Sequence, residues 1–239
     1  MRRLWTTAML AVVLSGTTAL QAGDKNLSAI LRGNYTTSSK IFFSPNAATE
    51  ELRNQYFELE GVLGFGVELR YQWPGESFFF TLSADYLSKV REQEQFVAFA
   101  GPQTRYPVVD GFFLIPVEFG VHTYIPLGSE TVRFSMGGGV SVYYGERIFR
   151  VADVDVAMQN RPIGVGIHIA SGFEYRLVSG ILLRGDMKFR DPELKTVSRY
   201  TQAETTYDGN RLSFPLNDIS GRINVNGMTF SLGVVVEIL

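Results

Sequence analysis

The chain of 239 residues contains no cysteine, which excludes disulfide bonds and thiolate metal sites. Beyond the N-terminal residues, no apolar run reaches the ~20 residues that a membrane-spanning helix requires. Apolar residues also do not keep helical spacing over any long stretch. The net charge of −2 does not indicate a nucleic-acid partner. Instead, 24 glycines and 13% aromatic residues favour a fold made of strands and turns.

The first 22 residues have the three parts of an export signal. Arg2 and Arg3 form a basic start, residues 4–14 are largely apolar, and residues 15–22 are mostly small and end in "ALQA". We predict cleavage after Ala22, which leaves residues 23–239 as one domain. The alternative, an N-terminal membrane anchor, would need a longer apolar run.

Apolar residues recur at every second position in eight segments, which predicts eight β-strands. The segments are residues 27–35, 56–73, 78–88, 110–128, 132–144, 163–177, 181–190 and 227–238. In "DGFFLIPVEFGVHTYIPLG", for example, Val117 and Phe119 belong to the apolar row, and Glu118 and His122 to the polar row. Pro116 lacks an amide hydrogen, so we expect a bulge or a distorted ladder there.

Short and long connections alternate between these segments. The long ones are residues 36–55, 89–110, 145–162 and 191–226. In an up-and-down meander, all long loops then lie at one end, as in outer-membrane barrels with short periplasmic turns and long extracellular loops. We therefore predict an all-β, eight-stranded antiparallel up-and-down transmembrane β-barrel in a bacterial outer membrane, with both termini in the periplasm.

The alternative all-β fold is a soluble barrel such as a lipocalin, with the apolar rows inside. Two features favour the membrane. Aromatic residues such as Tyr71, Trp73 and Tyr144 lie near the ends of the apolar rows, as in interfacial girdles. Glycines such as Gly64 and Gly66 cluster on the polar rows, where a narrow interior needs small residues.

The polar rows then face the interior of the barrel. Eight strands enclose a space that side chains can fill, and buried charges must pair. We predict a structural network of lumen charges formed by Glu58, Glu60, Glu68, Arg70, Asp85, Glu118, His122, Arg133, His168, Glu174, Arg176, Arg184, Asp186, Lys188, Arg190 and Glu237. Such a network plugs the barrel; the alternative is a gated narrow channel.

No catalytic, cofactor or metal site is predicted. His122 and His168 with Glu118 or Glu174 could ligate zinc, but hydrogen bonding inside the lumen is the preferred interpretation. In "HIAS", His168 and Ser171 lie on opposite faces of one strand, so they cannot form a nucleophile–base pair. The glycines of "RFSMGGGVSVYYG" lack the following helix and the Lys-Ser/Thr of a phosphate loop.

The pairing of "FFLIPVEFGVHTYIP" with "VRFSMGGGVSVYYG" resembles the OmpA/OmpX-like superfamily of small outer-membrane barrels. It is most similar to the outer membrane protein beta-barrel domain group common in Bacteroidetes-like bacteria. The resemblance implies architecture, with outer-membrane lipid and the barrel-assembly machinery as partners. Two departures matter: the chain ends in "VVVEIL" rather than an aromatic residue, and we expect no peptidoglycan-binding domain after the last strand.

The predicted function is a structural or surface-interaction role without catalysis. Loops on a rigid scaffold are the usual place for binding, so any surface ligand is expected at the four long loops. The first alternative is a narrow porin-like channel for small solutes, and the second is an outer-membrane hydrolase.

Overall fold

A computed structural model describes residues 26–96, 105–127, 129, 131–160 and 163–238. The predicted signal peptide, residues 1–22, lies outside the described residues. Nearly all of the described chain is strand, with one short helix, α2 (Glu50–Arg53). None of the helices in this described part is long and apolar enough to cross a membrane. The prediction of an all-β antiparallel fold is therefore confirmed.

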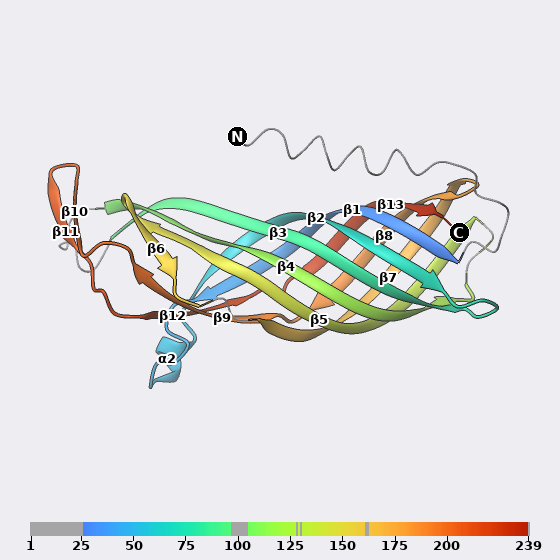
Figure 1. Cartoon of the computed structure of the whole chain (residues 1–239), viewed down its shortest axis with the longest axis horizontal. Coiled ribbons are helices and arrows are strands. Elements are labelled where there is room, and N and C mark those ends of the chain that lie inside the picture. The colour runs from blue at the N-terminus through green and yellow to red at the C-terminus, as the bar shows by residue number, and fades with distance from the viewer. Residues whose placement is uncertain (1–25, 97–104, 128, 130, 161–162, 239) are drawn as a thin grey trace.

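Eight long strands pair with one another in a closed circuit. Each strand is antiparallel to its neighbours, and the last strand pairs with the first. In circuit order they are β1 (Leu27–Phe42), β2 (Tyr56–Gln72), β3 (Phe78–Phe96), β4 (Arg105–Ile125), β5 (Val132–Val151), β7 (Gly164–Val178), β8 (Ile181–Arg190) and β13 (Met228–Glu237). Figure 1 shows them as a long, twisted tube, with the C-terminus at the end that carries the short turns.

The other end of the tube continues as an extension. There β6 (Val154–Met158), β9 (Glu193–Tyr200) and β12 (Ile219–Asn224) pair in series and link β5 to β1. A hairpin of β10 (Glu204–Tyr207) and β11 (Asn210–Ser213) lies at the tip (Figure 1). The prediction of four long loops is therefore wrong in large part: strands occupy much of them. Their short segments form strands because neighbouring strands supply the backbone partners.

The circuit of eight long strands carries apolar side chains outside and ionised ones inside. Leu63 and Val165 are 65% and 74% exposed, whereas Asp85 and Arg190 are 2% and 0% exposed. This arrangement reverses that of a water-soluble barrel. The alternation in the sequence predicts the same two faces for these strands.

The two faces of β2 change sides at Gly61. Toward the short turns, Val62 is buried and Leu63 is exposed. Toward the extension, Leu59 is buried, whereas Glu58 and Glu60 are exposed. Gly61 has φ +65°, a left-handed conformation that glycine adopts at little cost. The prediction that Glu58 and Glu60 face the lumen is therefore wrong, because one left-handed residue reverses the side on which alternate residues lie.

Replacing Gly61 with alanine should destabilise the fold by ~1–2 kcal/mol, the cost of a left-handed residue that has a Cβ. The added Cβ would meet its neighbours only at ordinary contact distances of 3.6 Å and more, so the backbone is the cause. Denaturant unfolding of the refolded protein measures this change. Gly33→Ala is the matched control, because a Cβ there has nothing within 4 Å; equal stability of the two variants would contradict the assignment.

Pro116 distorts the ladder without shifting it. On one side it pairs with Tyr143 of β5. On the other side, the pairs of β3 with β4 skip from Ala84↔Val117 to Leu87↔Leu114, with the register unchanged. The expected distortion is confirmed, and it is a gap in pairing rather than a bulge, because proline has no amide hydrogen to donate.

An apolar layer fills the interior between the ionised residues and the tip of the extension. Nine of its ten buried members lie on strands, and Val225 directly follows β12: Ile41, Leu59, Val62, Leu87, Phe112, Leu114, Tyr143, Leu194, Ile223 and Val225. A second cluster, which includes Val108, Val154 and Tyr200, fills the tip, and burial there raises the pKa of Tyr200 to about 12. The extension is thus packed like a water-soluble domain, apolar inside and charged outside.

Candidate functional site

We call the part of the tube that ends in the short turns the lower tube. Its interior holds a continuous ionic network. We define it by thirteen residues joined through ion pairs: Arg32, Glu68, Arg70, Asp85, Glu118, Arg133, Glu174, Arg176, Arg184, Asp186, Lys188, Arg190 and Glu237. Twelve of them are among the predicted lumen residues. Because they lie on alternate positions of several strands, ring closure brings them together.

Glu174 of β7 is one centre of the ionic network. Its Oε1 lies 2.5 Å from Arg70 Nη1 and 2.7 Å from Arg184 Nη1, and its Oε2 lies 3.3 Å from Arg133 Nη2. Arg184 also contacts Asp186 at 2.7 Å. One carboxylate thus holds three guanidinium groups, which ties β2, β5 and β8 to β7 across the interior.

Asp85 of β3 is a second centre. Its Oδ1 accepts from Arg32 Nη2 at 2.9 Å, and its Oδ2 accepts from Arg190 Nη2 at 3.1 Å. Glu118 lies 2.5 Å from Lys188 Nζ and 3.6 Å from Arg190 Nε. Among the described residues, Lys188 forms one ion pair, the one with Glu118, so loss of the Glu118 charge would leave a buried ammonium unpaired.

The ionic network reaches the end of the tube that carries the short turns. Arg133 lies 3.5 Å and Arg176 lies 3.8 Å from Glu237. The side chains of Arg133 and Arg176 are partly exposed there, unlike those deeper in the tube. Charges therefore fill the interior from this end to the apolar layer.

The two histidines lie inside but outside the ion pairs. His122 stacks on Phe79, with ring centroids 5.3 Å apart, and His168 Nδ1 shares a 2.9 Å hydrogen bond with Ser141 Oγ. A Cβ on Gly120 would lie 3.0 Å from His122 Nε2 and 3.2 Å from His168 Nε2, so glycine leaves room for both rings. The described residues contain no cluster of three or more metal-ligating acidic, histidine or cysteine side chains.

Sequence reasoning missed Arg32 and one buried ion pair in the extension. Arg32 is buried on β1 between exposed apolar neighbours. This alternation in the sequence indicates that Arg32 faces the lumen. Arg147 donates to both carboxylate oxygens of Asp110, at 3.0 and 2.6 Å. These two residues were missed because they fall at the edge of, or within, segments predicted to be loops.

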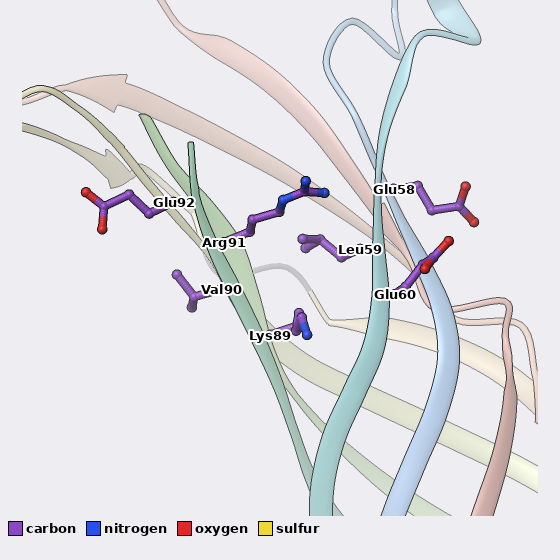
Figure 2. Close-up of a pocket in the computed structure, with 7 residues that line it drawn as sticks. All are labelled: Glu58, Leu59, Glu60, Lys89, Val90, Arg91 and Glu92. Carbon is purple, nitrogen blue, oxygen red and sulfur yellow. The ribbon is translucent and has the colours of Figure 1, made fainter. Parts of the chain in front are cut away.

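The wall of the tube is split between β2 and β3, on the side of the ionic network that faces the extension. Pairing of β2 with β3 ends at Leu63↔Ser88; beyond it, β2 pairs with β1 and β3 pairs with β4. A cleft of about 680 Å³ opens there. We call this cleft the split and define it by its lining residues, Glu58, Leu59, Glu60, Lys89, Val90, Arg91 and Glu92 (Figure 2).

Side chains of the split point in two directions. Figure 2 shows Leu59, Lys89 and Arg91 directed across the gap, whereas Glu58, Glu60 and Glu92 are directed away from it. Lys89 Nζ donates to the Gly61 carbonyl oxygen at 3.3 Å, which bridges the closed end of the gap. The Arg91 guanidinium lies 5.7 Å from the ring centroid of Phe57.

The fold and the interior together define a class of protein: an antiparallel β-tube with an apolar outer surface and an ionised core. No protein-family model matches the sequence, and neither does any curated protein. Among solved structures, the chain is similar to the outer membrane protein OprG from Pseudomonas aeruginosa. The identity is 14%, the match covers 90% of this chain and 97% of OprG, and the TM-score is 0.56.

Two further solved structures match less well. Neisserial surface protein A is 10% identical, with 88% of this chain and 96% of that chain covered and a TM-score of 0.47. The outer membrane protease OmpT from Escherichia coli is 8% identical, with 93% and 99% covered and a TM-score of 0.46. At these identities, the likeness to OprG shows the fold of an outer-membrane β-barrel protein. Membership of the OmpA/OmpX-like superfamily stays a prediction.

Proposed function

We propose that the chain forms an eight-stranded transmembrane β-barrel in a bacterial outer membrane. The apolar outer surface of the lower tube supports this proposal, because lipid is the solvent that favours such a surface. A closed circuit also satisfies the backbone of every strand within the bilayer. Outer-membrane lipid and the barrel-assembly machinery are then its partners, and the short turns and the chain termini lie in the periplasm.

We propose further that the barrel is closed to solutes and acts without catalysis, in a structural or surface-interaction role. One observation carries this proposal: two successive layers of side chains fill the interior, the ionic network and then the apolar layer. A hydrated path would have to cross both layers. This filling argues against the narrow channel.

The hydrolase alternative gains no support from the placement of the side chains. His168 is buried and Ser171 is exposed, so they lie on opposite faces as predicted. The buried carboxylates of Glu68, Asp85, Glu118 and Glu174 are held in ion pairs. A carboxylate held in this way is a poor general base, because the neighbouring cations stabilise its ionised form.

The closed lumen predicts that the refolded protein inserts into planar bilayers without steady single-channel openings. Heat-dependent gel mobility of the same sample serves as the control that the barrel is folded. Openings of constant conductance from a folded sample would overturn the closed-barrel proposal and favour the channel. Hydrolysis of lipid A or peptide by the refolded protein would favour the hydrolase instead.

A further inference from the structure

The split leaves two strand edges without a neighbouring strand among the described residues. Residues 56–60 and 62 of β2 have pairing partners on β1, and residues 89–96 of β3 have pairing partners on β4. An exposed strand edge presents a row of backbone donors and acceptors to which another strand can add. We propose that the split binds an extended segment of a partner polypeptide as an added strand, a proposal that rests on the surface-interaction role above.

The backbone of β3 is oriented for such addition. Pro107 of β4 has no amide hydrogen, and its carbonyl oxygen accepts from the Ala152 amide of the β5 side at 2.8 Å. Its partner on β3 is Glu94, so this pair exchanges no hydrogen bonds between β3 and β4. Because bonding alternates along an antiparallel strand, Glu94, Glu92 and Val90 direct their N–H and C=O groups toward the β2 side.

The side chains around the split specify the chemistry of the added strand. Glu58 and Glu60 on one edge and Glu92 on the other are exposed on the outer face. Cross-strand neighbours of opposite charge are favourable, so outward positions of the added strand should be basic. On the inner face, Leu59 and the stems of Lys89 and Arg91 contact the added strand, which favours uncharged apolar residues there.

An extended peptide fits these features better than a small anion. An anion could pair with Lys89 and Arg91, but it would leave the amide groups of Val90 and Glu92 without partners and would face the carboxylates at the rim. The volume of about 680 Å³ lies within the range of ligand-binding clefts. The proposed occupant is therefore a strand that alternates basic and apolar residues.

A labelled short peptide of alternating Val and Lys tests the proposal with the full-length protein in lipid nanodiscs. We expect saturable binding by fluorescence anisotropy, weakened about ten-fold when alternate peptide amides are N-methylated, since each lost backbone bond weakens binding. A peptide of the same composition with its lysines in one block controls for non-specific charge attraction. Equal binding of all three peptides, or none, would overturn strand addition.

Variants of the protein test the same contact from the other side. Val90→Pro removes an amide directed into the split, whereas Val90→Thr keeps it, so only the proline variant should lose affinity. If Val90→Pro fails to fold, the N-methylated peptide still decides the question. Glu58→Lys together with Glu60→Lys should reverse the preference from the Val-Lys peptide to a Val-Glu peptide; an unchanged preference would contradict the proposed charge pattern.

The two proposals fail in different ways. A folded, non-conducting barrel that binds neither peptide would overturn the strand-addition site and leave the closed barrel standing. A conducting barrel that still binds the Val-Lys peptide would overturn the closed lumen and leave the site standing.

Discussion

Glu118→Gln should destabilise the folded barrel by about 3–5 kcal/mol, because it leaves the buried Lys188 ammonium without its carboxylate. Lys188 is 4% exposed, and its Nζ lies 2.5 Å from Glu118 Oε2. Glutamine keeps the size of the side chain, removes the negative charge and replaces one carboxylate oxygen with an NH2 group. The free energy of unfolding, from urea titration of the protein refolded in lipid, measures the change.

A second variant separates the loss of a partner from the loss of a side chain. The double variant Glu118→Gln/Lys188→Met removes both charges and should recover much of the lost stability, since replacing a whole buried pair is often neutral. Glu60→Gln is the matched surface control and should change stability by less than ~0.5 kcal/mol, because Glu60 is exposed. If the single and double variants were equally unstable, the pair would not carry the effect.

Val140→Arg should cost ~2–4 kcal/mol, the cost of a guanidinium on the lipid face near the middle of a bilayer. Val140 is 59% exposed on β5, between the outward aromatic side chains of Phe134 and Tyr144. If Val140 faced water instead of lipid, the same substitution would change the free energy of unfolding very little. The stability of the refolded protein in a lipid bilayer therefore reports which solvent surrounds this surface.

Ile148→Arg is the control for the lipid face. Ile148 is also exposed, at 37%, and lies on the same outward row of β5, but in the extension. We expect a change of less than ~0.5 kcal/mol there, as for an ordinary surface substitution. Equal costs at Val140 and Ile148 would contradict a bilayer boundary between them.

Alternation along the strands predicted much of the ionic network. Glu118 of β4 and Glu174 of β7 occupy the polar rows of their segments, and both are buried as that pattern indicates. The partners of each charge could not be predicted, because the distance between Asp85 and Arg190 depends on how the circuit closes. The pairing of the extension's strands could not be predicted either, because β12 bonds to β1 and β6 bonds to β9, and these partners are far away in the sequence.

By itself, the sequence determined the fold class and, between the points where the faces exchange, which residues of one strand share a face, because a strand places alternate side chains on opposite sides. Only the tertiary structure decided where the two faces of a strand exchange sides and where the wall opens. A single left-handed residue, Gly61, exchanges the two sides of β2 without any change in the alternation. The position of the split also depends on the tertiary structure, because two strands pair only where their paths in space keep them side by side.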